Sequence, residues 1–292
     1  MASHVEQHFV PSFLLEEWHA PPDSKLTAFR WSRNGLVCHR YKAKSVAKER
    51  HLYSMERSRA MPNVELEQRF FGPHVDDPAA RVHAKILVSG VRDLAVEDRQ
   101  AWGPFLMSLM LRVPSMVRSI RAKGRVILSA RLDEDRNEYL DVRGEEPEAS
   151  LREWVEKHSP DLLDDIGVRT LPQLVFSEKL NHAILNSTWA TVSVTGARFD
   201  LLISDRPLIV SGTFATKFLV ALPVSPKRLF LAFSSPETLD RLNSTDKDEL
   251  VRESNLSSVD GAERYVYGSS ARQEAFVRKF LARPADTSTP PQ

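Results

Sequence analysis

The chain has almost no cysteine, since Cys38 is the only one among its 292 residues. A single cysteine excludes an internal disulfide bond, and it fits a reducing compartment. Cys38 lies in "GLVCHRY", an alternating stretch that is typical of a β-strand. Because an unpaired cysteine is among the residue types most often buried, we interpret Cys38 as a structural residue rather than a catalytic nucleophile.

Long hydrophobic runs are also lacking. The longest candidate, "FLMSLML" at residues 105–111, falls far short of the roughly 20 apolar residues that a membrane-spanning helix needs. No lysine or arginine precedes Lys25, whereas a secretion signal begins with a basic region. These absences predict a cytoplasmic protein without a membrane partner.

Neither sign of charge is in excess, because 40 Lys and Arg stand against 39 Asp and Glu. The overall field therefore gives no reason to expect nucleic acid or an acidic partner. One local segment is basic: residues 40–59, "RYKAKSVAKERHLYSMERSR", contain seven Lys or Arg and two Glu. This segment either contacts phosphate groups, with Tyr41 and Tyr53 available to stack on bases, or forms a solvated surface.

The motifs of several large enzyme classes are missing as well. The sequence contains no GxxxxGK(S/T), GxGxxG, HExxH, GxSxG or paired CxxC pattern. This argues against P-loop nucleotidases, Rossmann dehydrogenases, zinc proteases with the HExxH helix and α/β-hydrolases.

Three kinds of pattern follow one another along the chain. Asn34-Gly35 separates two alternating segments, so residues 26–41 are predicted to form a β-hairpin. Residues 63–186 have mainly helical spacing, and residues 188–233 contain short β-rich runs bounded by Gly, Pro and Ser. This order predicts an α+β fold whose C-terminal strands form a mixed or antiparallel sheet with flanking helices. The hairpin either joins that sheet or stands apart.

We expect one α+β domain over residues 1–283, followed by a disordered, proline-rich tail at 284–292. A helical pattern over residues 96–124 contains Pro104 and Pro114, which predict a break or kink at one or both positions. Gly124 is a candidate for the end of that helix.

Several short stretches occur in an order that resembles one family. The chain opens with "QHFVPSFLLEEW", in which Gln7-His8 precedes an aromatic residue and Val10-Pro11. It continues with "LEQRF", "LMLRVPSMVRSI", "LLISDRPLIV" and "LPVSPKRLFLAF". This ordered series resembles the domain of unknown function 4238 family (DUF4238), which is common in bacteria, over about the whole chain. The resemblance implies a shared fold and a shared site, and it brings no established activity.

One position departs from the pattern of that family. "LEQRF" places Glu67 at the family's glutamate, and the family often carries a second glutamate about two turns later. Here that region reads "FFGPHVDD". His74, Asp76 or Asp77 would have to substitute for the second glutamate, or the position does not matter.

Asp205 and Arg206 form the sharpest local candidate for a site. They follow the apolar run "LLIS" directly, and the end of a strand is a common place for functional residues. Asp205 is suited to bind a metal ion or to act as a base, and Arg206 to bind an anion. The alternative is a plain turn, because Ser and Asp before x-Pro are ordinary turn residues.

His8, Glu67 and Asp205 are ligand types that suit Mg²⁺, Mn²⁺ or Zn²⁺, so together they are a candidate divalent-metal and catalytic set. The alternative for His8 is a partly buried ring that holds the N-terminal segment in place, and for Glu67 a solvated helix face. Arg112, Asn181 and Arg206 are candidates for substrate binding.

Two functions follow from these candidates. The first is an intracellular, metal-dependent hydrolase that acts on a phosphate-containing substrate or nucleic acid. The second is a non-catalytic binding module, in which the same residues cap turns and the helical centre presents a surface to a partner.

Overall fold

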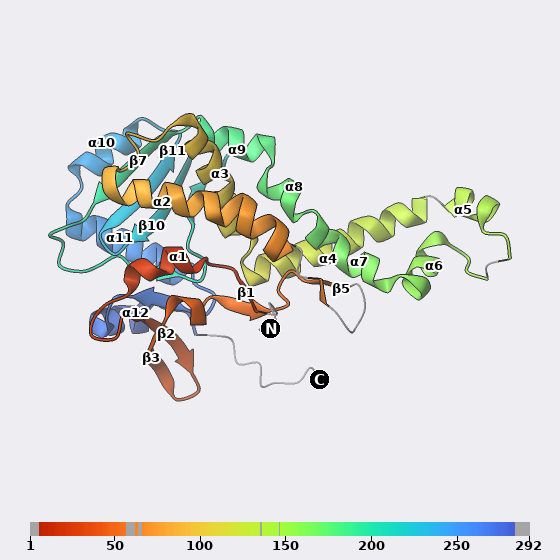
Figure 1. Ribbon diagram of the computed structural model, residues 1–292, viewed down its shortest axis with the longest axis horizontal. Coiled ribbons are helices and arrows are strands. Elements are labelled where there is room, and N and C mark those ends of the chain that lie inside the picture. Colours follow the sequence, from red (N-terminus) through yellow and green to blue (C-terminus); the bar gives the residue numbers. More distant parts are fainter. Residues whose placement is uncertain (1–5, 57–61, 64–65, 135, 146, 284–292) are drawn as a thin grey trace.

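A computed structural model describes residues 6–56, 62–63, 66–134, 136–145 and 147–283. The tail at 284–292, which the sequence predicts to be disordered, lies outside these residues. The fold is α+β, as predicted, with a body of helices and antiparallel strands from which a helical arm projects (Figure 1).

The C-terminal strands form a four-stranded antiparallel sheet inside the body. Its order is β7 (Thr188–Ser193), β11 (Arg228–Phe233), β10 (Phe218–Ser225) and β9 (Ile209–Gly212). Of the two arrangements that the sequence allowed, the sheet is therefore the antiparallel one.

Helices cover both faces of this sheet. Val220 and Phe230 belong to the core that includes residues of α2 (Asp77–Ser89) and α3 (Val96–Leu111). Their neighbours Ala221 and Leu231 belong to a second cluster, which includes residues of α10 (Glu237–Ser244) and α11 (Lys247–Asp260). The strands are apolar on both sides because each of their faces is buried against helices.

The predicted hairpin is confirmed, and it joins a second sheet. This sheet is antiparallel, in the order β3 (Gly35–Tyr41), β2 (Leu26–Ser32), β12 (Val266–Gly268) and β8 (Ile203–Ser204). Residues of α11 and of α12 (Glu274–Phe280) share its apolar cluster. The hairpin therefore does not stand apart from the C-terminal half.

The helical centre breaks at one of the two expected prolines. Helix α3 continues past Pro104, whereas α4 (Pro114–Glu134) begins at Pro114. Pro114 disfavours the helical region for the residue before it, so the break falls at this point. The expectation that a helix ends at Gly124 is wrong, because α4 runs through Gly124 to Glu134.

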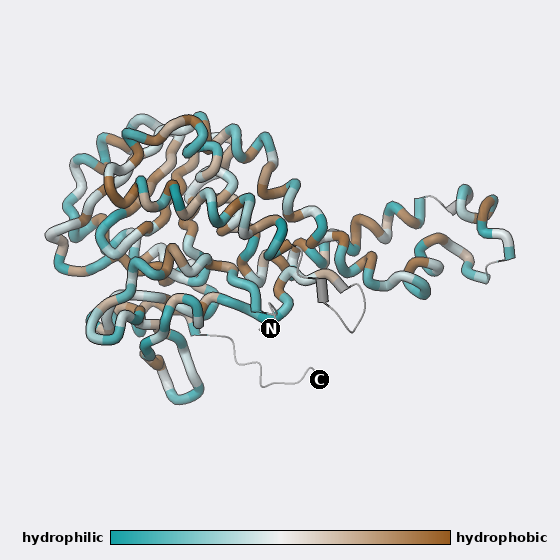
Figure 2. Tube along the Cα trace, viewed as in Figure 1, coloured by the Kyte–Doolittle hydropathy of each residue, from teal (hydrophilic) through white to brown (hydrophobic). Residues whose placement is uncertain are grey.

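Gly124 has a packing role instead. A Cβ atom at Gly124 would lie 2.6 Å from the backbone of Gly167 on α7 (Pro160–Arg169). The two glycines therefore let α4 and α7 pack closely. With α5 (Arg136–Val142) and α6 (Leu151–His158) these helices build the arm, along which hydrophobic and hydrophilic stretches alternate (Figure 2).

The remaining helices complete the body. Helix α1 (Ser12–Leu15) and a short 3-10 turn follow the first strand, and α8 (Leu171–Val175) and α9 (Glu178–Leu185) return the chain from the arm. In the described parts of the chain, we find no helix that combines the length and the apolar character needed to cross a bilayer.

Candidate functional site

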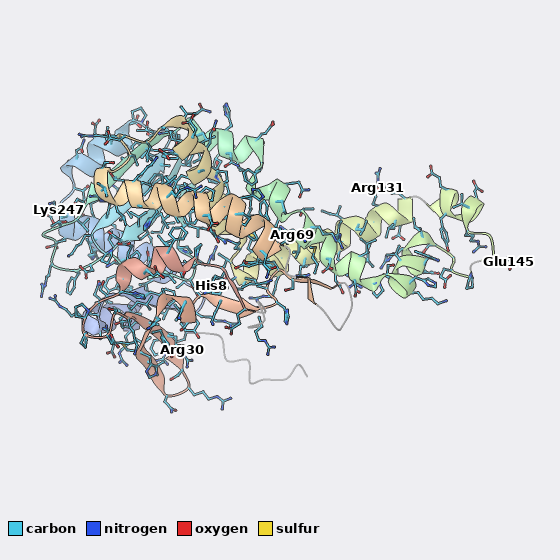
Figure 3. All side chains as sticks on the ribbon, viewed as in Figure 1. His8, Arg30, Arg69, Arg131, Glu145 and Lys247 are labelled. Carbon is cyan, nitrogen blue, oxygen red and sulfur yellow. The ribbon has the colours of Figure 1, made fainter. Side chains whose placement is uncertain are left out.

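Four segments that are far apart in the sequence meet where the arm leaves the body. They are β1 (Glu6–His8), the turn that leads into β5 (Met55–Glu56), a π-helix at Leu66–Asp76, and the end of α3. Figure 3 shows Arg69 of the π-helix near the middle of the molecule, where the arm begins, and His8 in the neighbouring part of the body.

Gln7 ties β1 to the turn before β5. Its side chain is fully buried, Nε2 donates to Ser54 Oγ at 2.9 Å, and Oε1 accepts from the Tyr53 backbone N–H at 2.8 Å. A buried amide with both ends bonded fixes the position of both segments. This explains the glutamine of the Gln7-His8 pair, because it holds Tyr53 beside the histidine.

His8 is half-buried, and its surroundings lower the pKa of its ring and so favour the neutral form. Burial lowers the pKa of the ring and outweighs the bond to the Lys44 carbonyl, which raises it. Lys48 and Arg112 lower this pKa further, whereas Asp76 raises it. Nε2 lies 3.3 Å from the Lys44 carbonyl oxygen. Because that oxygen only accepts, we assign the proton to Nε2, and Nδ1 then carries the lone pair of a base.

Tyr53 links His8 to Glu67. Its hydroxyl lies 3.0 Å from the His8 carbonyl oxygen and also donates a hydrogen bond to the Glu67 carboxylate. Burial, followed by the charge of Glu67, raises the pKa of Tyr53 well above its usual value. The phenol therefore keeps its proton and shares it between the two acceptors.

The π-helix determines which residues face this cluster. In a π-helix each hydrogen bond spans five residues, so a turn takes roughly four to five residues instead of the 3.6 of an α-helix. Glu67, Phe71 and Asp76 follow one another at that spacing and share one face. In an α-helix Glu67 and Asp76 would point to opposite sides. Such rare helical segments frequently occur at functional sites.

Arg112 closes the cluster from the end of α3. Its guanidinium group is fully buried and donates to both Asp76 carboxylate oxygens, at 2.8 and 2.9 Å, and to Ser108 Oγ at 3.1 Å. It also lies over the Phe71 ring, 4.7 Å from the centroid. Burial lowers the pKa of Arg112, but the ion pair with Asp76 raises it more, so the group stays charged.

The structure distinguishes the three residues that could stand in for the second glutamate. Of these three, Asp76 is the one whose carboxylate pairs with Arg112. His74, on the same π-helix, is exposed. The sequence indicates Asp76 only as one of three residues that could substitute for the second glutamate, because its nine-residue spacing from Glu67 places the two on one face only in a π-helix.

The three candidate metal ligands, His8, Glu67 and Asp205, do not come together in a metal site. Among the residues that the structure describes, no three His, Cys, Asp or Glu side chains lie together as a metal ion would require, and His8, Glu67 and Asp205 are all described. The structure joins His8 to Glu67 through Tyr53, and it uses Asp205 elsewhere.

Asp205 holds a turn together. Its two carboxylate oxygens accept the backbone N–H groups of Glu263, Arg264 and Tyr265 at 2.7–2.9 Å. Burial raises the pKa of Asp205 to about 6, and the three N–H donors act in the opposite direction. Ser204 Oγ bonds to the backbone of Arg206, whose own side chain is exposed. These contacts match the turn alternative.

Asn181 lies on α9, outside the cluster. Its Nδ2 donates to the Val175 carbonyl at 2.8 Å and to the Ser177 carbonyl at 3.1 Å. These bonds fasten the start of α9 to the preceding turn. The candidate substrate-binding residues Arg112, Asn181 and Arg206 thus lie in three separate networks, and only Arg112 belongs to the cluster around His8.

A family model described as "Protein of unknown function (DUF4238)" matches residues 6–272. The chain belongs to the DUF4238 family. The match includes β1, the π-helix, the end of α3 and the Asp205 turn. Every residue of the cluster around His8 therefore lies inside the matched region. Comparison with curated proteins and with solved structures finds no match.

Proposed function

We propose that this DUF4238 protein is a hydrolase of a reducing compartment, that it acts on a phosphate-containing substrate, and that its catalytic site is the cluster around His8. One observation carries the proposal. A neutral histidine, a tyrosine–glutamate pair and a buried aspartate–arginine pair come together from four segments, and one of those segments adopts a costly π-helix to present both carboxylates.

His8 is the proposed general base. With its pKa lowered and its proton on Nε2, Nδ1 is free of a proton at pH 7, as a base requires. Nδ1 takes a proton from water, the water oxygen bonds to phosphorus, and the ester P–O bond breaks as the leaving oxygen takes a proton from solvent. Tyr53, Glu67, Asp76 and Arg112 position His8 and set its electrostatic surroundings.

The basic segment supports a phosphate-containing substrate. Strand β4 (Lys48–Arg50) pairs with β1, and Lys48 stands opposite His8 in the register. Lys44, whose carbonyl accepts from the His8 ring, is exposed. Lys48 Nζ pairs with the Glu6 carboxylate, so Lys44 is the lysine suited to hold a phosphate group beside the base and to neutralise charge that develops on it.

His8→Asn is expected to lower turnover of a phosphoester about 10²–10⁴-fold, the usual contribution of a general base. The measurement is a panel of phosphomonoesters, phosphodiesters and single-stranded oligonucleotides, tested with EDTA and with Mg²⁺, Mn²⁺ or Zn²⁺. His74→Asn is the matched control, because His74 is exposed on the π-helix. Equal losses in the two variants, or no turnover by the wild type on any substrate, contradict the proposal.

One feature favours the second candidate function, a binding module. A groove of about 790 Å³ runs along the arm, lined mainly by apolar residues of α4, α7 and α8. Val126 and Ile127 in this groove are 69% and 70% exposed. Large apolar side chains gathered in an open groove mark an interaction surface.

We propose that a second copy of the chain occupies this groove. Lys123 and Glu134 line it about 16 Å apart along α4, judged from the rise per residue. In a two-fold antiparallel pair of arms, Lys123 of each copy faces Glu134 of the other, and Ile127 is buried near the axis.

Ile127→Asp is expected to abolish such a dimer, because it places two carboxylates in the apolar centre of the interface. Sedimentation velocity at concentrations up to about 100 µM, near the weak end of specific association, measures the effect. Val88→Asp is the control, since Val88 is exposed on α2 and does not line the groove. A monomeric wild type, or a dimer that persists in Ile127→Asp, contradicts this assignment.

A further inference from the structure

A second pocket lies in the body, at the end away from the arm. It has a volume of about 540 Å³ and lies between α11, α12 and the loop at residues 196–200. Lys247, at the start of α11, marks this end in Figure 3, while Glu145 marks the tip of the arm. The pocket contains none of the residues of the His8 cluster.

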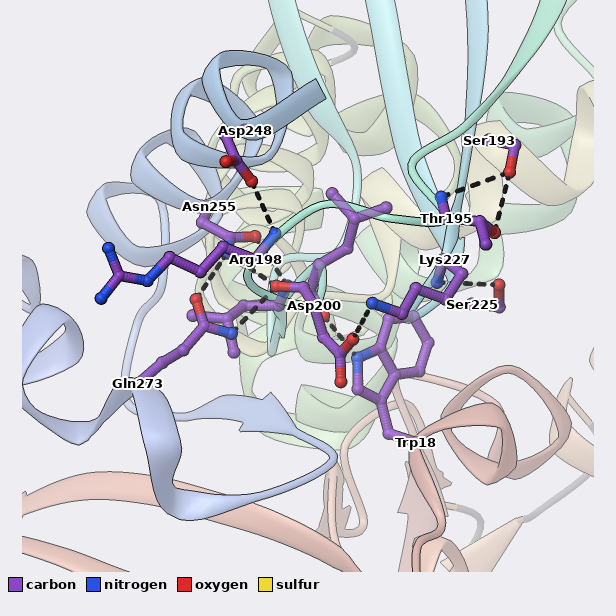
Figure 4. A network of polar contacts seen from close by, with 12 residues as sticks. Trp18, Ser193, Thr195, Arg198, Asp200, Ser225, Lys227, Asp248, Asn255 and Gln273 are labelled. Carbon is purple, nitrogen blue, oxygen red and sulfur yellow. Dashed lines mark hydrogen bonds and ion pairs between the residues drawn. The ribbon is translucent and has the colours of Figure 1, made fainter. Parts of the chain in front are cut away.

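The floor of this pocket is a closed hydrogen-bond network (Figure 4). Asn255 Nδ2 donates to the Asp200 carbonyl and to Gln273 Oε1, both at 2.9 Å, and its Oδ1 accepts from the Leu202 N–H at 2.7 Å. Gln273 Nε2 donates to the same Asp200 carbonyl at 2.9 Å. Each buried amide end has a partner, so the floor is rigid before any ligand arrives.

The rim of the pocket is positively charged. Arg198, Arg252 and Lys279 line it and are exposed, and none of them makes an ion pair with a described residue. Asp248 is the one acidic residue in the lining, and its Oδ1 accepts the backbone N–H of Arg198 at 2.6 Å. Three cations around a concave site attract an anion.

The walls of the pocket are aromatic. Phe199, Phe276 and Phe280 line it. The ring centroids of Phe276 and Phe280 lie 4.9 Å apart. Arg198 and Lys279 lie over ring faces, 5.3 Å from the Phe199 centroid and 5.1 Å from the Phe280 centroid. Aromatic faces beside cations suit a ligand that has both a planar ring and a negative charge.

We propose that this pocket binds a nucleoside monophosphate, with the base against the phenylalanine rings and the phosphate between Arg252 and Lys279. The volume lies within the roughly 300–1,000 Å³ range of small-molecule sites. This site goes beyond the proposed hydrolase activity, because it is separate from the His8 cluster and does not depend on turnover.

Calorimetric titration of the whole protein with AMP, adenosine and inorganic phosphate tests the proposal. AMP is expected to bind at least about tenfold more tightly than adenosine or phosphate alone, because only AMP supplies both ring and charge. Arg252→Gln and Lys279→Gln are each expected to weaken AMP binding about tenfold. Added salt is expected to weaken it as well.

Two variants distinguish binding in this pocket from a general loss of positive charge and from binding at the His8 cluster. Arg278→Gln is the matched control, because Arg278 is an exposed neighbour that pairs with Glu274 and does not line the pocket. His8→Asn is expected to bind AMP as the wild type does. The proposal is overturned if AMP does not bind at about 1 mM, if adenosine or phosphate binds as tightly as AMP, or if Arg278→Gln loses as much affinity as Lys279→Gln.

Discussion

Asp76→Asn is expected to lower the free energy of unfolding by about 3–5 kcal/mol, the cost of removing one partner from a buried ion pair. Arg112 is fully buried and remains charged, and Asp76 is the carboxylate that accepts from both of its terminal guanidinium nitrogens. The amide of an asparagine at this position provides one acceptor oxygen and no negative charge. The buried guanidinium is then left without its counter-ion.

Urea denaturation of the wild type and three variants measures this effect. Asp77→Asn is the matched control, because Asp77 is the exposed neighbour of Asp76, and we expect it to cost less than about 1 kcal/mol. Replacing both partners, as in Asp76→Leu with Arg112→Met, is expected to recover much of the loss, since an apolar pair leaves no unpaired charge. If Asp76→Asn costs no more than Asp77→Asn, the ion pair is not what holds the π-helix to α3.

Asp205→Ala is expected to destabilise the protein by about 3 kcal/mol, because each partly buried N–H that loses its acceptor costs about 1 kcal/mol. Three N–H groups, at residues 263–265, lose their acceptor at once. Arg206→Ala, at the exposed neighbouring position, is expected to change stability by less than about 0.5 kcal/mol. Equal effects of the two substitutions on stability would contradict the structural role assigned to Asp205.

The cost of Asp205→Ala is also expected to depend on pH. Folding raises the pKa of Asp205 from 3.8 to about 6, so the folded protein holds this proton more tightly than the unfolded chain does. The stabilisation of the folded state that comes from this tighter proton binding is fully present below pH 3.8 and is lost as the pH rises through about 6. Asp205→Ala should therefore cost more at pH 4.5 than at pH 8, by an amount on the order of 2–3 kcal/mol. A cost that grows with pH contradicts this.

Much of the fold could be predicted because its signals are local. Asn34-Gly35 indicates the hairpin, the short β-rich runs after residue 188 indicate the sheet, and Pro114 marks the start of α4. The prediction that a helix ends at Gly124 is wrong, because a glycine can either end a helix or allow another helix to pack closely against it. The sequence does not show which of the two applies until α7 is in place.

The site was only partly predictable, because its convergence depends on long-range contacts. His8 and Glu67 were recognised, but the link between them runs through Tyr53, which is set by the buried Gln7. The α-helical period also hides the shared face of Glu67 and Asp76. For Asp205, residue type alone fits a base and a turn equally, and the downstream N–H groups that it binds cannot be inferred from spacing.

The pH dependence of phosphoester hydrolysis by the purified protein tests the central claim most directly. We expect turnover to fall on the acid side with an apparent pKa below 6.5, the ordinary value for histidine, because burial lowers the pKa of His8. His74→Asn should keep this profile, and His8→Asn should lose the turnover that defines it. Turnover that survives in His8→Asn with the same acid limb would contradict the assignment of His8 as the base.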